Sequence, residues 1–194
     1  MRFPQLSLAM AAASLFLSAC TPSTVSLDYL PNLASNVRGP AVFSVGEFAD
    51  LRGMAPNHIG GIGLPGLVNL ENVYLKVNVD QAVKNAMLHA LAARQMLSSN
   101  RPKYLLSGEV LDLHCEMLKN PYASVRLKVN LTDTSTGRVV HSREYTGERQ
   151  SVFYVHGSGD PVPILRNLTS RALQDAVDKA IDDASMRRVM RGER

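Results

Sequence analysis

The alternation of apolar and polar residues divides most of the chain into strands. Residues 123–132 alternate strictly, with an apolar side chain at every second position from Ala123 to Leu131, which is typical of a strand with one buried face. Related patterns predict further strands at the following positions: 40–47, 72–79, 103–118 and 138–149. The apolar phase switches within the long third segment of this list, which predicts a β-bulge near Gly108.

Two segments repeat their apolar residues with the period of an amphipathic helix. The first runs from Asp80, a candidate N-cap, to about Ser98, just before a proline. The second runs from Asp160 to about Met190, with Pro161 at its first helical position. We therefore expect an α+β fold, a two-layer sandwich in which two helices pack on one face of a sheet. The sheet is expected to be mixed, mostly antiparallel and four- to five-stranded.

In two segments the apolar residues do not recur at a regular spacing. Residues 20–39 are rich in Pro, Ser and Asn and predict a flexible tether, although residues 25–29 would serve as an edge strand if the tether were part of the packed structure. Residues 50–70 are irregular and rich in glycine and proline, which predicts a loop with a function or high mobility. The apolar residues within positions 57–70 suggest an alternative function for the protein, a groove that holds a small molecule or a lipid.

The N-terminal residues have the pattern of an export signal. Arg2 precedes an apolar run over residues 6–17, which is too short to span a bilayer core of ~30 Å as a helix. The run ends in Leu-Ser-Ala-Cys at residues 17–20, and this resembles the lipobox of bacterial lipoproteins. The resemblance implies cleavage between Ala19 and Cys20 and attachment of lipid to Cys20. The alternative is an ordinary secretory signal with a coincidental cysteine.

These features predict four parts along the chain. A signal peptide covers residues 1–19, a lipidated tether 20–39, a single periplasmic domain 40–190 and a basic tail 191–194. No later segment approaches 18 consecutive apolar residues, so lipid on Cys20 is the only membrane attachment that the sequence predicts. The arginines near the C-terminus either touch anionic lipid or, more simply, suit the end of a solvated helix: Arg187, Arg188, Arg191 and Arg194.

The sequence argues against most ligand chemistries. The net charge of +4 is mild and evenly spread, which disfavours nucleic acid as a partner. Residues 61–66 match G-x-G-x-x-G, but no helix opens directly after them, so we expect no nucleotide. The five histidines have no metal-ligand spacing, although His114 and His141 would form a pair if they faced each other across strands.

No catalytic motif stands out either. Cys115 lies in an apolar strand pattern and predicts a buried, inert thiol. His156 and Ser158 are close in sequence, but no strand-to-helix elbow accompanies them, and an enzyme would need both in one cleft. We therefore expect a protein without a cofactor and without enzymatic activity.

Short motifs between residues 45 and 60 resemble the opening of the YajG family of bacterial lipoproteins. Val-Gly-Glu-Phe at 45–48 leads to Asp50-x-Arg52 and then to Ile59-Gly60. The order of elements over residues 41–185 is more distantly similar to the auxiliary lipoproteins of ABC-type envelope transport systems and to LptE-like and LpoB-like lipoproteins. The resemblance implies an accessory or protein-interaction module in envelope transport or assembly, with other envelope proteins as partners.

Two further expectations depend on this resemblance. Thr21, rather than an aspartate, follows Cys20, which in enteric-type sorting implies the outer membrane facing the periplasm, with the inner membrane as the alternative. The candidate site residues are Asp50, Arg52, Ile59 and Gly60. The Asp50 carboxylate would accept loop N–H bonds, and Arg52 would pin the loop or bind a partner carboxylate.

Overall fold

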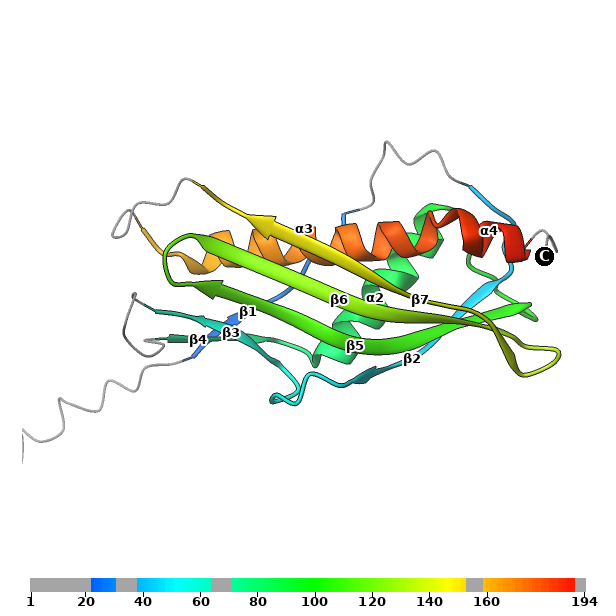
Figure 1. Ribbon diagram of the computed structural model, residues 1–194, viewed down its shortest axis with the longest axis horizontal. Coiled ribbons are helices and arrows are strands. Elements are labelled where there is room, and N and C mark those ends of the chain that lie inside the picture. The colour runs from blue at the N-terminus through cyan, green and yellow to red at the C-terminus, as the bar shows by residue number, and fades with distance from the viewer. Residues whose placement is uncertain (1–21, 31–37, 64–70, 153–158, 191–194) are drawn as a thin grey trace, which may run out of the picture.

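The computed structural model describes residues 22–30, 38–63, 71–152 and 159–190 (Figure 1). The strands are β1 (Ser23–Val25), β2 (Phe43–Asp50), β3 (His58–Ile62), β4 (Glu71–Leu75), β5 (Tyr104–Met117), β6 (Pro121–Asp133) and β7 (Arg138–Gln150). The helices are α2 (Val79–Ala93), α3 (Val162–Ile181) and α4 (Ala184–Met190). The two long helices lie on one face of the sheet (Figure 1).

The strands form one seven-stranded sheet in the order β1-β4-β3-β5-β6-β7, and β2 pairs with the first half of β5. The pairs β1–β4, β2–β5 and β3–β5 are parallel, and the other three are antiparallel. The α+β class is confirmed. The expectation of four to five mostly antiparallel strands is wrong, because β1 is only three residues long and β3 contains two glycines, so neither shows an alternating pattern.

The core lies between the sheet and the two long helices. The odd-numbered residues of β6 from Ala123 to Leu131 are fully buried, as their alternation predicts. They face α3, whose buried stripe includes Ala172 and Ala176. Burial of each large aliphatic side chain contributes roughly 1.5–3 kcal/mol, so this layer provides most of the driving force for folding.

Two details differ from the predicted elements. The bulge expected near Gly108 lies at Leu111, where the register between β5 and β6 shifts. The predicted last helix is interrupted after Ile181, and α4 begins as a separate short helix. Asp183 causes this break, because its carboxylate accepts the backbone N–H of Ser185 at 2.6 Å and so caps α4.

The packed structure begins at Ser23, so the expectation of a flexible tether is wrong over residues 22–30. β1 adds to the edge of β4, and Val25 is 5% exposed. Tyr29 Oη donates a hydrogen bond to Asp178 on α3 at 2.6 Å and accepts one from Arg94 at 3.1 Å. The edge strand that was considered for residues 25–29 is present as β1, at Ser23–Val25.

Truncation of this segment is expected to destabilise the domain. A chain that begins at residue 38 should be about 3 kcal/mol less stable than one that begins at residue 22, because it loses the burial of Val25 and a charge-assisted hydrogen bond of Tyr29. Urea unfolding of both chains measures the difference. Equal midpoints would show that β1 does not contribute to the stability of the domain, and that the stable domain begins near residue 40.

Candidate functional site

Asp50 and Arg52 form a closed clamp at the end of β2. Arg52 Nε and Nη2 donate to the two carboxylate oxygens of Asp50, at 2.9 Å each. Arg52 Nη1 donates to the carbonyls of His58 at 2.7 Å and Leu113 at 3.0 Å. The second Nη2 hydrogen points at the Ala55 carbonyl, 3.3 Å away. All five guanidinium donors therefore have acceptors inside the fold, which leaves none for a partner carboxylate.

The electrostatics of the clamp agree with an internal role. The Arg52 side chain is only 2% exposed. Its hydrogen bonds hold the pKa of Asp50 below the usual range of a carboxyl group, so Asp50 stays ionised. The clamp ties the loop after β2 to both β3 and β5.

Ile59 and Gly60 lie beside this clamp, on β3. Ile59 is fully buried in the core. Gly60 has φ +139°, and a Cβ on it would lie 1.7 Å from the Cys115 carbonyl oxygen. Only glycine permits this close approach of β3 to β5. The four predicted site residues therefore come together where β2, β3 and β5 meet, and the segment expected as a loop contains a strand.

The two cysteines have different places. Cys20 and the neighbouring Ala19 lie outside the described residues, as do His156 and Ser158. Cys115 is fully buried on β5, and burial raises the pKa of its thiol to about 11. A thiol with this pKa is almost entirely protonated at neutral pH and is a poor nucleophile.

Asp112, His114 and Ser124 meet on the sheet face opposite the helices, a cluster that the sequence analysis did not identify. Ser124 Oγ donates to Asp112 and lies 3.0 Å from His114 Nδ1. The same Nδ1 lies 3.3 Å from Asp112 Oδ1, and this hydrogen bond raises the pKa of His114. A Ser-His-Asp relay needs serine and aspartate on different ring nitrogens. This cluster therefore acts as a polar contact between β5 and β6.

The part of the chain that the structure describes contains no group of three His, Cys, Asp or Glu side chains that would hold a metal ion. His114 and His141 do not face each other. His114 lies opposite Ser124 and His141 opposite Leu131, and these positions on β6 are about 23 Å apart at 3.3 Å per residue.

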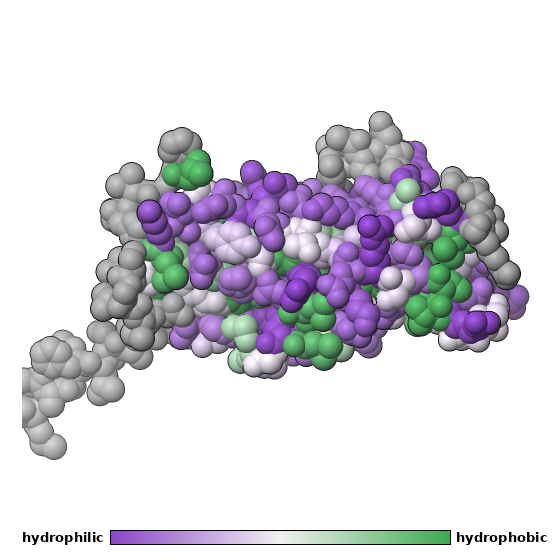
Figure 2. Space-filling model, in the orientation of Figure 1, coloured by the Kyte–Doolittle hydropathy of each residue, from purple (hydrophilic) through white to green (hydrophobic). Residues whose placement is uncertain are grey.

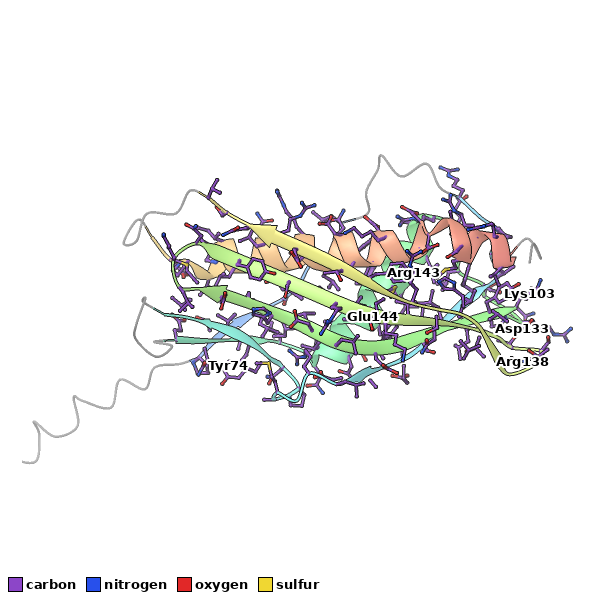
Figure 3. The ribbon with its side chains drawn as sticks, in the orientation of Figure 1. Tyr74, Lys103, Asp133, Arg138, Arg143 and Glu144 are labelled. Carbon is purple, nitrogen blue, oxygen red and sulfur yellow. The ribbon has the colours of Figure 1, made fainter. Side chains whose placement is uncertain are left out.

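A groove of about 960 Å³ lies at the end of the sheet where β5 begins and β6 turns into β7. We call it the distal groove. Its lining combines positive and apolar side chains: Lys103, Arg138 and Arg188 with Val139, Val140 and Val189. Figure 2 shows apolar surface flanked by hydrophilic residues near this end of the molecule, and Figure 3 shows Lys103, Asp133 and Arg138 together there.

The distal groove has an excess of positive charge. Asp133 is the carboxylate in its lining, and it accepts two hydrogen bonds from Ser135, at 2.9 Å and 2.6 Å. Among the described residues, no carboxylate oxygen lies within 4 Å of the side-chain nitrogens of Lys103, Arg138 or Arg188. The hydrogen bonds from Ser135 lower the pKa of Asp133, and the positive charge of Lys103 adds to this effect. Three cations against one carboxylate still leave an excess of positive charge, and a concave surface with such an excess attracts negatively charged groups.

β7 forms one edge of the sheet, and its second half is covered by α3 and by Asp183, which follows it. Arg143 pairs with Asp183 at 3.0 Å, and Arg149 pairs with Asp175 at 2.6 Å. Lys179 Nζ donates to the carbonyl of Thr146 at 2.7 Å. These contacts occupy the edge over residues 143–149.

The first half of β7 is open. Val139 is 57% exposed and Val140 38% exposed, beside the distal groove. In the described parts of the chain, no backbone group outside β6 bonds to residues 138–142. The register shift next to His141 makes this stretch irregular, which is a common protection against edge-to-edge aggregation. Exposed valines on an open edge are unusual and mark a candidate contact surface.

The sequence contained a signal for this surface. Val139 and Val140 are adjacent, which breaks the alternation of the predicted strand directly after Arg138. The position of Arg188 could not be inferred, because α4 reaches the groove only through the packing of α3 on the sheet.

No family model matches the sequence, and no curated protein matches it. Solved structures with a similar fold exist. The protein XCC0632 from Xanthomonas campestris, of the family DUF330, is 15% identical with a TM-score of 0.65, covering 90% of this chain and 100% of that one. An uncharacterized protein is 14% identical with a TM-score of 0.50, covering 82% of this chain and 99% of that one.

A candidate lipoprotein from Caulobacter crescentus is 13% identical, with a TM-score of 0.46 over 70% of this chain and 92% of that one. At this TM-score the likeness carries no conclusion. At 15% identity, the Xanthomonas likeness concerns the fold alone. This chain therefore shares the overall fold of the DUF330 protein XCC0632 from Xanthomonas campestris.

Proposed function

We propose that this chain is a lipid-anchored, non-enzymatic protein of the bacterial envelope that binds an acidic segment of another envelope protein in the distal groove. The groove carries the proposal, because it combines three cations, against one carboxylate, with exposed valines on an open strand edge. Positive charge would select the acidic groups of the partner, and the valines would bury its apolar side chains.

The envelope location rests on the lipobox at residues 17–20 and the residue that follows it. Several acyl chains on Cys20 would hold the protein stably on a membrane, since each buried methylene contributes ~0.8 kcal/mol. Thr21 favours the outer membrane. The D-x-R element keeps the YajG-type lipoproteins as the proposed family. None of the described helices is long and apolar enough to cross a membrane.

The irregular edge at Val140 limits how a partner would bind. A regular added strand needs an unbroken ladder, and the register shift in β7 interrupts it. We therefore expect side-chain contacts in the groove to provide most of the affinity, with only a short stretch of backbone pairing beside Val139.

Site-specific crosslinking in intact cells tests this function. A photoreactive amino acid in place of Val139 should capture a partner, and mass spectrometry should locate the crosslink in a segment rich in Asp and Glu. The same amino acid in place of Glu148 is the matched control, because Glu148 lies on the covered half of the same strand and is also exposed. Combined Lys103→Glu and Arg138→Glu should reduce the crosslink at least about tenfold, since like charges at an interface cost several kcal/mol.

Two results would contradict the proposal. Equal crosslinking from positions 139 and 148 would mean that the groove has no special role. A specific crosslink that survives both charge reversals, or that maps to a segment without acidic residues, would mean that positive charge does not select the partner.

A further inference from the structure

The strand pairings bring several chain segments to one end of the sheet. Ile62 pairs with Met117, Met117 pairs with Pro121, and Gln150 lies beside Tyr122. β1 starts at the same end, because it runs parallel to β4, whose first residue pairs with Ile62. We call this end, at the left in Figure 1, the anchor end.

The lipidated cysteine cannot lie far from the anchor end. Two residues, Thr21 and Pro22, separate Cys20 from Ser23, the first residue of β1, and the three steps along the chain span at most about 10 Å. Ser23 is held in place by its pairing with Val73 and by a hydrogen bond from its hydroxyl to Glu71. The described chain after Pro22 therefore contains no long tether, and with lipid on Cys20 the fold would begin almost at the membrane.

Exposed apolar residues are present at the anchor end. Leu118, directly after β5, is 39% exposed, and Val152, two residues after β7, is 69% exposed. Apolar side chains next to a lipid anchor gain free energy by entering the interface of the bilayer. Water exposure of both residues in the isolated domain is the expected state of a surface that meets lipid.

The distal groove lies at the other end of the molecule. β5 runs from the groove at Tyr104 to the anchor end at Met117, a span of about 40 Å at 3.3 Å per residue. Over β5–β7, the face of the sheet away from the helices carries more carboxylates than cations: Glu109, Asp112, Glu116, Glu144 and Glu148 against Arg126 and Lys128. Lys128 pairs with Glu109 at 3.2 Å, and the remaining excess of negative charge would be repelled by anionic lipid if the domain lay on that face.

We propose that the anchor end faces the membrane, with Leu118 and Val152 in the head-group layer and the distal groove pointing away from it. This orientation rests on the proposed lipidation of Cys20. In this orientation the two ends of the sheet have separate roles. The anchor end contacts the lipid surface, and the distal groove at the other end binds the acidic protein partner. The distance between them keeps the groove outside the head-group layer, which is only several Å thick.

Fluorescence quenching in vesicles tests the orientation. The full chain, purified with its lipid, is labelled at a new thiol in four variants: Leu118→Cys, Val152→Cys, Leu51→Cys and Val139→Cys. All four positions are exposed, and the buried Cys115 does not compete for the label. The vesicles contain phosphatidylethanolamine, phosphatidylglycerol and a lipid with a quencher on its head group. Labels at 118 and 152 should lose most of their fluorescence, and the label at 139 should keep it.

The label at residue 51 separates end-on from side-on binding. Leu51 is 56% exposed on the loop after β2, away from both ends of β5. Strong quenching at 51 with little at 118 would overturn the orientation in favour of a domain lying on its side. Strong quenching at 139, or no quenching at any of the four positions, would overturn it as well.

Failure of the anchor can be recognised separately. Intact mass measurement before labelling shows whether Cys20 carries lipid, and Cys20→Ala should release the chain from the vesicles. If Cys20 carried no lipid, both this orientation and the proposed membrane attachment would be contradicted. Crosslinking from the distal groove to an acidic partner would still be measurable in that case.

Discussion

Gly60→Ala is expected to destabilise the domain by about 4 kcal/mol, since steric overpacking and backbone strain each cost 1–3 kcal/mol. The new Cβ would lie 1.7 Å from the Cys115 carbonyl oxygen and 2.8 Å from its carbon, and neither backbone atom can yield without moving β5. The φ of +139° adds strain for any residue with a side chain. Thermal and urea unfolding of the purified domain measure the loss.

Gly137→Ala is the matched control for this substitution. Gly137 also has a positive φ, +69°, but no atom lies within 4 Å of the position of its Cβ. This variant should lose only about 1 kcal/mol, the cost of the left-handed conformation alone. Similar losses in the two variants would mean that the close crossing of β3 over β5 is not what requires glycine at position 60.

Arg94→Leu is expected to destabilise the domain by about 4 kcal/mol, in the range found when one partner of a buried ion pair is removed. Arg94 is 3% exposed at the end of α2. Its guanidinium pairs with Asp178 at 2.9 Å and Asp182 at 3.0 Å, both near the end of α3, and also donates to Tyr29. The substitution removes the cation that joins the two helices and the N-terminal segment, and leaves its partners partly buried.

Lys84→Met provides the control for Arg94→Leu. Lys84 lies on the same helix and pairs with Glu47, whose side chain is 82% exposed. Exposed ion pairs contribute at most about 1 kcal/mol, so this variant should unfold almost like the natural protein. If Arg94→Leu loses no more stability than Lys84→Met, the Arg94 network does not fasten α2 to α3. Equilibrium unfolding monitored by circular dichroism distinguishes the two cases.

The elements that were predicted correctly are those with long, regular patterns. β6 alternates from Ala123 to Thr132, and α3 repeats its apolar residues over 20 residues, so local sequence is sufficient for both. β1 was missed because it is three residues long, and β3 because two glycines interrupt the pattern of its five residues. Strands this short are stabilised by their neighbours in the sheet, and their own residues contain too little pattern to identify them.

The candidate site was likewise predicted only where it depends on residues that are close in sequence. Asp50 and Arg52 were recognised as a local pair, since residues two apart at a strand end can reach each other. The carbonyls of His58 and Leu113 that complete the clamp come from other strands. Gly60 could be named as special, but the reason for it, the Cys115 carbonyl, became apparent only from the packing of β3 against β5.

By itself, the sequence determined the α+β class and the strongly patterned elements, because each depends on residues that are neighbours in the chain. The export signal and the lipidation of Cys20 rest on the same kind of local pattern and stay predictions. The tertiary structure decided the rest. It placed residues 23–25 in the sheet as β1 and packed Tyr29 against α3. It also assembled the distal groove from β5, β6, β7 and α4. Surfaces of this kind depend on contacts between residues far apart in sequence, and no local pattern encodes them.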